Sequence, residues 1–551
     1  MLILAKLRIT NFFSEQMGIA WSLFIFALML ELIYVSLTVF MSYWLNAFYT
    51  SLQEFDYAAF LRLLWIFGGL VCLIVITSIS KFYCRQLLEI KWRKWLNDHF
   101  LESYFNNRNY YILQLHQKST DNPDQRIADD IVKLTNLTLD LFFGIFQAIV
   151  SFISFVFVLW QLSGSLNISL GKIQIIIPGY LVWCAIMYSG LGTWIAIKVG
   201  KPLTDLNYLR EKCEGDFRYA LTHIRGNVES IAFYAGESQE KIFLNKLFHN
   251  VIDNFKNIMK QMIRYNWFIN FYMNATIVFP TLVASSKYFA KVISLGDLMQ
   301  ISSVFNRVQN SLSFVIQNFP QIADWKAIVQ RLIDFQNKIY ENNTNTCKHE
   351  IGLSDSIEFK NFTLLYPNGK ILINNLDLKI NPGEHTLISG GSGVGKSSLL
   401  RCVANIWPYY KGQLKLPTNK VIVFLPQKPY IPLNNLLEVI CYPYSAQNID
   451  LTTVEKLLGK CHLKHLKKQF HETKDWSNVL SLGEQQRIAF VRLMLQSPQW
   501  IILDEVTSSL DEVAEKYFYQ MLIEHFRHAT IVSTGHRSNL RQFHRKYYVI
   551  N

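Results

Sequence analysis

A glycine-rich stretch in the C-terminal half carries the strongest chemical signal in the chain. "HTLISGGSGVGKSSLL" contains the pattern Gly-x-x-x-x-Gly-Lys-Ser between a predicted strand and a predicted helix. Glycines let backbone N–H groups curl around phosphate oxygens, the lysine reaches the β- and γ-phosphates, and the serine hydroxyl suits Mg²⁺. We therefore predict a site for a nucleotide and Mg²⁺ along nine residues: Gly390, Gly391, Ser392, Gly393, Val394, Gly395, Lys396, Ser397 and Ser398.

Two carboxylates follow an apolar run further along the chain. "WIILDE" reads as a buried strand that ends in Asp504 and Glu505. Asp504, at the strand tip, suits the coordination shell of Mg²⁺. Glu505 could act as a general base that polarises the water attacking the γ-phosphate. An apolar run ending in Asp-Glu is weak evidence alone, but it becomes informative downstream of a phosphate loop.

Three single residues extend this site. Gln427 in "FLPQKPY" follows a predicted strand, and its amide could ligate Mg²⁺ or a water bound to it. His536 in "IVSTGHRS" ends another strand, where an imidazole could contact the γ-phosphate. Tyr366, about 30 residues before Lys396, is a candidate to stack on the adenine, with ordinary core packing as the alternative. A lone Gln or His is usually structural, so their order and strand-end placement carry the functional interpretation.

A family resemblance follows from these motifs together with "LSLGEQQR", residues 480–487, which we call the signature loop. The series from the phosphate loop through "SSLD" (508–511) to His536 resembles the nucleotide-binding domain of ABC transporters. In that family the signature loop faces the γ-phosphate of ATP held by a second domain. The resemblance implies that Ser481, Gly483 and Glu484 complete the nucleotide site of a partner domain. The N-terminus of the helix that follows would then face the phosphate bound there. Leu482 departs from the common LSGGQ or LSGGE pattern.

The composition indicates a membrane protein. Half of the 551 residues are hydrophobic, only 17% are charged, and the mean hydropathy is +0.14. The formal charge of +13 could suggest nucleic acid, but the basic residues flank hydrophobic runs, so we expect cytosolic loops and no nucleic-acid partner. Eight single cysteines argue against a zinc site or a disulfide framework. The N-terminal "MLILAKLRITNFFSEQ" is interpreted as an interfacial segment.

The two halves of the chain differ in pattern. The first half predicts six transmembrane helices, each near the roughly 20 residues that cross a bilayer: 17–44, 60–80, 137–160, 173–197, 267–289 and 298–319. Long basic stretches after the second and fourth spans are expected in the cytosol with both termini. The second half alternates short β-rich runs with helices, which predicts an α/β P-loop domain with a mainly parallel sheet. The expected domains are 1–335, a linker at 336–353, and 354–551.

Two cytosolic stretches narrow the resemblance. "TDNPDQRIADDI" (120–131) and "VESIAFYAGE" (228–237) are similar to loops of class D ABC half-transporters and their bacterial SbmA/BacA and YddA relatives. The resemblance implies an exporter-type fold and a half-transporter that dimerises, most simply with itself. Pro123 would break a helix, and the charged side chains suit docking to the nucleotide domains, although a solvated loop is the alternative: Asp121, Asp124, Arg126, Glu229 and Glu237. No organelle address is evident, so a bacterial inner membrane is expected.

The sixth predicted span gives the only indication of cargo. Polar residues follow one another there at helical spacing, interrupted by Phe314: Gln300, Ser303, Arg307, Asn310 and Gln317. Such a face is expected to line a hydrophilic cavity, with Arg307 attracting anionic groups, or to pack against neighbours. Glu31 is a second intramembrane charge. Hydrophilic cargo such as cobalamin or peptides is favoured over export of lipid or fatty acyl-CoA, and over an ATPase-gated sensor that moves no solute.

Overall fold

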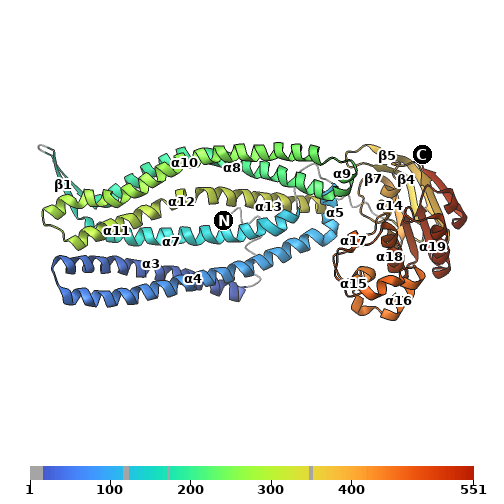
Figure 1. The fold of residues 1–551 in the computed structure, drawn as a ribbon, viewed down its shortest axis with the longest axis horizontal. Helices are drawn as coiled ribbons and strands as arrows, with labels where there is room; N and C mark the ends of the chain where they lie inside the picture. Colours follow the sequence, from blue (N-terminus) through green and yellow to red (C-terminus); the bar gives the residue numbers. More distant parts are fainter. Residues whose placement is uncertain (1–16, 116–122, 171–172, 346–351, 419, 551) are drawn as a thin grey trace. The chain divides into compact units, whose positions relative to one another are not determined.

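The computed structural model describes residues 17–115, 123–170, 173–345, 352–418 and 420–550 (Figure 1). The predicted interfacial segment at 1–16, residues 120–122 and Cys347 of the predicted linker lie outside the described residues. Contacts divide the chain into two units. The first unit is Met1–Ser103 with Asp121–Asn337, and the second is Tyr104–Thr120 with Lys338–Asn551.

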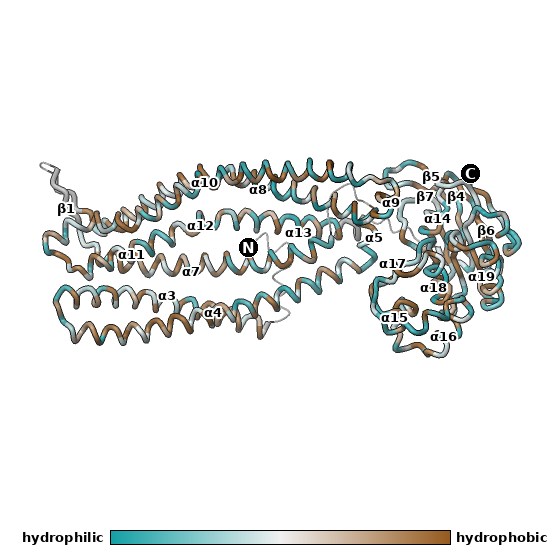
Figure 2. The backbone as a smooth tube through the Cα atoms, viewed as in Figure 1, coloured by the Kyte–Doolittle hydropathy of each residue, from teal (hydrophilic) through white to brown (hydrophobic). Residues whose placement is uncertain are grey.

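Long helices make up the first unit. Five helical stretches among the described residues are long and apolar enough to cross a membrane. Helices α8 and α10 run side by side along most of their length, and their residues become more hydrophilic from Lys198 to Arg264 (Figures 1 and 2). The main helices of this unit are α3 (Met17–Gln53), α4 (Tyr57–Phe105), α7 (Ile131–Ser163), α8 (Tyr180–Gly226), α10 (Glu237–Phe289), α11 (Leu295–Leu312), α12 (Phe314–Gln317) and α13 (Phe319–Asn345).

The predicted start of the fourth transmembrane span, at residue 173, is wrong. Residues Ile173–Pro178 form strand β2, which pairs antiparallel with β1 (Ser165–Leu170), and helix α8 begins only at Tyr180. Gly179 makes the turn with a φ of +63°, and a Cβ on it would lie 2.4 Å from the Trp160 ring. A short apolar run cannot be assigned to strand or helix by periodicity alone, and the β-branched isoleucines here favour the strand.

The sixth predicted span is a series of shorter helices. Helix α11 begins with a capping box, in which Ser294 and Asp297 each accept a hydrogen bond from the other's backbone, and it ends at Leu312. Helices α12 and α13 follow. Helix α11 packs against α3, α7, α8 and α10. Its buried face, which includes Val304, Phe305 and Val308, forms the core of this unit together with residues of α7 and α8.

A parallel sheet of five strands forms the centre of the second unit and confirms the expected α/β domain. Its strand order is β11-β6-β10-β9-β8, and every neighbouring pair is parallel. Because the carboxyl ends of parallel strands share one edge, the segments that follow them meet there. The strands are β6 (Thr386–Gly390), β8 (Ile422–Leu425), β9 (Trp500–Asp504), β10 (Thr530–Thr534) and β11 (Lys546–Ile550).

A second sheet and several helices complete this unit. The sheet has the order β3-β7-β4-β5, with β4 antiparallel to both of its neighbours. Its strands are β3 (Gly352–Ser354), β4 (Ile357–Leu365), β5 (Ile371–Ile380) and β7 (Tyr410–Pro417). The helices that matter for the site are α14 (Lys396–Val403), α15 (Leu436–Cys441), η4 (Lys464–Gln469), α18 (Leu482–Met494) and α19 (Glu512–His525).

A short segment from the first predicted cytosolic stretch belongs to the second unit. It contains η1 (Asn106–Arg108) and α5 (Asn109–Leu115). The Arg108 guanidinium donates a 2.6 Å hydrogen bond to the carbonyl of Ala404, which ends helix α14. Leu115 packs against the core that includes Leu399 and Leu400 of the same helix. This segment therefore contacts the helix that follows the phosphate loop.

Candidate nucleotide site

The phosphate loop connects β6 to α14 through glycines that no other residue could replace without strain. Gly390, Gly393 and Gly395 have φ values of +155°, +82° and +104°. A Cβ on Gly390 would lie 2.3 Å from the carbonyl oxygen of Ile550, and one on Gly395 would lie 2.9 Å from the Leu372 side chain. The loop leads directly into the N-terminus of α14, where backbone N–H groups lack helical partners. This geometry suits the binding of phosphate oxygens.

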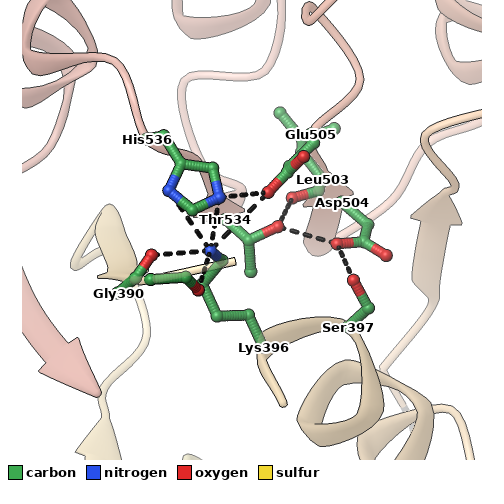
Figure 3. A network of polar contacts seen from close by, with 9 residues as sticks. Gly390, Lys396, Ser397, Leu503, Asp504, Glu505, Thr534 and His536 are labelled. Carbon is green, nitrogen blue, oxygen red and sulfur yellow. Dashed lines mark hydrogen bonds and ion pairs between the residues drawn. The ribbon is translucent and has the colours of Figure 1, made fainter. Parts of the chain in front are cut away.

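Lys396 is the central cation of the site (Figure 3). Its side chain is only 5% exposed, and its ammonium donates to the carbonyls of Gly390 and Gly391 at 2.8 and 3.1 Å. The same nitrogen lies 2.7 Å from Nε2 of His536 and 3.7 Å from Oε1 of Glu505. The structure therefore brings five of the predicted residues to one point at the edge of the sheet.

The predicted Mg²⁺ ligands also meet. The Ser397 hydroxyl donates to Oδ1 of Asp504 at 2.9 Å, and Thr534 at the end of β10 donates to the same oxygen at 2.8 Å (Figure 3). A hydroxyl beside a carboxylate provides the hard oxygen ligands that Mg²⁺ prefers. These side chains therefore fit the ion that the sequence predicts. Sequence reasoning missed Thr534, whose only signal was a hydroxyl two residues before the predicted His536.

Glu505 combines an unusual backbone with a direct contact to His536. Its φ is +48°, a left-handed conformation that is uncommon for a residue other than glycine and that tends to occur at functional sites. Its Oε1 lies 3.1 Å from Nε2 of His536. Both side chains keep solvent access, with 24% and 44% exposed. The carboxylate is thus held at the sheet edge within reach of a water molecule.

Two predicted residues make no hydrogen bond to this cluster among the described residues. The Gln427 side chain is exposed, and no hydrogen bond among the described residues joins it to Ser397 or Asp504. Its backbone carbonyl instead accepts from the buried Gln486 of α18 at 3.3 Å. Tyr366 lies in the turn after β4, where its N–H donates to Lys370, and its ring is 41% exposed. The roles of Gln427 and Tyr366 stay predictions.

The signature loop is held at the N-terminus of α18 by a capping box. Ser481 is the exposed N-cap, and its Oγ accepts from the N–H of Glu484 at 3.3 Å. The Glu484 carboxylate accepts in return from the Ser481 N–H at 3.0 Å and from its hydroxyl at 2.9 Å. Gly483 is partly buried, and the Leu482 side chain is 43% exposed. The predicted loop residues thus lie at a helix N-terminus on the surface of this unit.

Arg492 fixes the position of α18. Its guanidinium donates to the carbonyl of Val439 at 2.6 and 3.0 Å and to that of Tyr430 at 2.7 Å. Burial lowers the pKa of Arg492 to about 10, so that it stays charged at neutral pH. The cation therefore ties the signature helix to α15 and to the segment that follows Gln427.

A second network was missed in the sequence. Glu515 of α19 is 1% exposed and accepts hydrogen bonds from Arg537 at 3.3 Å and from Asn539 at 3.1 Å. Arg537 also donates to the carbonyls of Ser508 and Leu510, in the "SSLD" stretch, at 3.1 and 3.0 Å. The only signal was an arginine directly after His536. Because Arg537 is adjacent to His536, this network positions both the histidine and the "SSLD" stretch.

The predicted polar face of the sixth span is only partly exposed. Arg307, Asn310 and Gln317 are exposed, and Ser303 is half-buried. Gln300 departs from this face, because it is 1% exposed and accepts a 2.7 Å hydrogen bond from Asn46 of α3. The Arg307 guanidinium lies 5.9 Å from the centre of the Phe155 ring. The open part of the face is therefore cationic and amide-rich.

The intramembrane Glu31 has a partner that the sequence did not indicate. Its carboxylate is 3% exposed and lies 3.1 Å from the Lys81 ammonium of α4. Lys81 also lies 4.5 Å from the centre of the Tyr34 ring. A charge buried in a membrane-spanning helix needs such a partner. The pair therefore has a structural role between α3 and α4.

The charged residues of the two cytosolic stretches fall into two groups. Arg126 donates at 2.6 Å to Asp130, which is 1% exposed and also accepts from Arg331 of α13. Arg126 thus stabilises its own unit. Glu229 and Glu237 are exposed beside helix α9 (Val228–Phe233), and Asp124 is exposed as well. Asp121 lies outside the described residues.

Comparison with known proteins identifies the family. The family pattern described as ABC transporter transmembrane region 2 matches residues 4–290, and that described as ABC transporter matches residues 373–508. The chain belongs to the ABC transporter family. Its nucleotide-binding half is an ATPase domain coupled to transport, and its helical half acts in a membrane.

Individual relatives confirm the resemblance to YddA and to class D. The inner membrane ABC transporter ATP-binding protein YddA of Escherichia coli (strain K12) is 32% identical over 483 residues, which cover 87% of this chain and 84% of YddA. ABC transporter D family member 2, chloroplastic, of Arabidopsis thaliana is 31% identical over 578 residues, covering 91% of this chain and 79% of that protein.

A solved structure confirms the exporter-type fold. The structure of a bacterial Atm1-family ABC exporter with ATP bound superimposes with a TM-score of 0.75 at 16% identity, covering 96% of this chain and 93% of that one. Half-transporters of this ABC fold function as dimers.

Proposed function

We propose that two copies of this ABC chain form a homodimeric transporter that moves a hydrophilic solute across a bacterial inner membrane. Each ATP would lie between the phosphate loop of one copy and the signature loop of the other. The observation that carries the proposal is the convergence of Lys396, Ser397, Asp504 and Glu505 at one edge of the parallel sheet.

The residues at the sheet edge would divide the work of hydrolysis. The glycine-rich loop and Lys396 hold the phosphates, and Ser397 and Asp504 hold Mg²⁺, which offsets negative charge on the phosphates when bound. Glu505 accepts a proton from the attacking water, and His536 contacts both Glu505 and Lys396. Because the ammonium of Lys396 is already buried beside the loop carbonyls, it is oriented before the nucleotide arrives.

A second copy would complete the site. The sheet-edge cluster contains no residue of the signature loop, whereas Ser481 lies exposed at the N-terminus of a 13-residue helix. Such a terminus favours the negative charge of phosphate. Exposed aromatic residues at the end of α9 also suit a protein contact, since Phe233 and Tyr234 are 81% and 87% exposed.

The polar face of α11 favours hydrophilic cargo. Arg307 and Asn310 are exposed on α11, whose opposite face is packed in the core of its unit, and Gln317 is exposed in α12. An exposed cation and amides at membrane depth are stable only beside water or a polar partner. We therefore favour an anionic or zwitterionic hydrophilic solute, such as a cobalamin or a peptide, over lipid or fatty acyl-CoA.

Transport in proteoliposomes tests this function. The purified chain would be reconstituted, and ATP-dependent movement of cobalamin, peptides and a fatty acyl-CoA would be followed in both membrane orientations. Movement of a hydrophilic solute in the wild type, and its loss in Glu505→Gln, is the expected result. Movement of acyl-CoA alone would support the lipid alternative. ATP turnover without movement of any solute would support a non-transporting sensor.

A further inference from the structure

A histidine outside the known motifs contacts the signature loop. Nε2 of His465, in η4, lies 3.0 Å from Oε1 of Glu484. The other carboxylate oxygen of Glu484, Oε2, accepts both the N–H and the hydroxyl of Ser481. Glu484 therefore bridges His465 to the N-cap serine, with one carboxylate oxygen on each side.

The carboxylate between them is charged and specifically hydrogen-bonded. Burial alone would raise the pKa of Glu484, but hydrogen bonds from Ser481 and His465 outweigh burial and hold that pKa below its usual value. An ionised carboxylate with two oxygens accepts most strongly when donors approach both. A donor on Oε1 therefore restricts rotation of the carboxylate and keeps Oε2 on Ser481.

The Ser481 hydroxyl has one proton and two possible acceptors. In this structure the hydroxyl donates to Oε2 of Glu484, with 2.9 Å between the two oxygens, while Oγ accepts from the Glu484 N–H. While that bond is made, a phosphate oxygen of the partner's nucleotide would accept from the N–H groups at the start of α18 that lack helical partners. The orientation of the Glu484 carboxylate therefore decides how Ser481 and these N–H groups are presented.

We propose that His465 is a positioning residue for the signature loop, and that it lowers the ATP concentration needed to assemble the nucleotide site between two copies. By donating to Oε1, it fixes the Glu484 carboxylate and hence the Ser481 cap before the partner arrives. Pre-ordering a loop removes part of the entropic cost of association. The inference rests on the proposed role of Ser481 in the partner's site.

His465 reaches Glu484 from the surface of its unit and does not form part of the core. Its side chain is 57% exposed. Its neighbours Leu463 and Leu466, at 0% and 3% exposure, anchor the backbone of η4 in the core. Substitution of His465 therefore removes the hydrogen bond and leaves this core contact intact.

The test is steady-state ATP hydrolysis by the full chain in proteoliposomes. His465→Ala is expected to raise the KM for ATP about threefold to tenfold, because it removes one hydrogen bond to a charged group and water replaces that bond only in part. The kcat is expected to change less than about twofold. His465→Gln keeps a donor and is expected to restore most of the affinity. His471→Ala changes another exposed histidine of the same unit and is expected to behave as wild type.

Ser481→Ala distinguishes a failure of the positioning role of His465 from a failure of the proposed role of the signature loop. If Ser481→Ala impairs hydrolysis but His465→Ala leaves the KM unchanged, the positioning role of His465 is wrong and the proposed function stands. If His465→Gln is as impaired as His465→Ala, the hydrogen bond is not the cause and the inference is also overturned. If Ser481→Ala itself behaves as wild type, the proposed role of the signature loop fails first.

Discussion

The Ser397 hydroxyl lies 2.9 Å from the carboxylate of Asp504, although the two residues are 107 positions apart in the sequence. Ser397 is in the first turn of α14, and Asp504 ends β9. Strand β10 lies between β6, which leads to α14, and β9, and all three are parallel. Their carboxyl ends therefore face the same edge, where the next residue, Glu505, lies beside Lys396 and His536.

Glu505→Gln should separate ATP binding from ATP hydrolysis. The amide keeps the size of the side chain and its place beside His536, but it cannot accept the proton of the attacking water. Loss of a general base typically slows turnover about 10²- to 10⁴-fold. We expect that loss in ATPase assays of the reconstituted chain, with nucleotide affinity retained. Near-normal turnover would refute the role of Glu505, and Glu512→Gln, an exposed carboxylate of α19, is the matched control.

Much of this site could be predicted because its signals are local. The glycines, Lys396 and Ser397 are contiguous, and Asp504 and Glu505 directly follow an apolar strand. Thr534 could not be predicted, because its contact with Asp504 depends on the pairing of β10 with β9. The same holds for Lys81 and Glu31, which lie 50 residues apart on different helices.

The fold was predictable to the same extent. Long apolar runs indicate the membrane helices. Short β-rich runs that alternate with helical stretches indicate the α/β domain. The sequence predicts a helix at Ile173–Pro178, where the structure has a strand, because a short and mostly apolar run fits either structure. Helical spacing places Gln300 on a polar face that lines a cavity or packs against neighbours, but it cannot show that Asn46 of another helix is the partner.

Arg307→Cys should react with a membrane-impermeant thiol reagent in the nucleotide-free state, and its reactivity should change when ATP is added. The side chain at this position is exposed, whereas Val304 and Val308 are 0% exposed in the helix core. Cysteines at those two positions should stay unlabelled, and labelling is best measured after the exposed Cys72 is replaced by serine. Equal labelling at all three positions would contradict a hydrophilic pathway along α11.

Arg307→Ala should then lower transport of anionic solutes while basal ATP hydrolysis stays largely intact. The change removes a cation from the exposed face of α11 and none from the nucleotide site. Transport and ATPase rates measured on the same proteoliposomes would show the difference. Unchanged transport of every anionic solute tested would argue against this residue as an attractor of cargo.

Acidification should destabilise the nucleotide-binding unit through His544. Its imidazole lies 2.8 Å from both the Leu540 carbonyl and the Ser533 hydroxyl, and burial lowers its pKa to about 4. The neutral form is favoured on folding, so the stabilisation is complete above the unfolded pKa of about 6.5. It declines as the pH falls from there through 4, with a loss on the order of 3 kcal/mol.

Thermal unfolding of the full chain as a function of pH would check this. His544→Gln removes the titrating group and should have a flatter dependence of Tm on pH between 6.5 and 4 than the wild type. His471→Gln, at an exposed histidine, should keep the wild-type slope. Parallel curves for the wild type and His544→Gln would show that this histidine does not titrate on unfolding.

The ATPase activity of a mixed dimer tests most directly whether two copies of the chain share each nucleotide site. Ser481→Arg and Lys396→Ala should each inactivate the homodimer, because every site then lacks either its signature loop or its phosphate lysine. Co-expressed with two different affinity tags and purified through both, the two variants form a heterodimer with one intact composite site and one doubly damaged site. We expect partial recovery of ATP hydrolysis in this heterodimer, well above either homodimer. Absence of any recovery in a heterodimer that still binds ATP would contradict a nucleotide site shared between two copies.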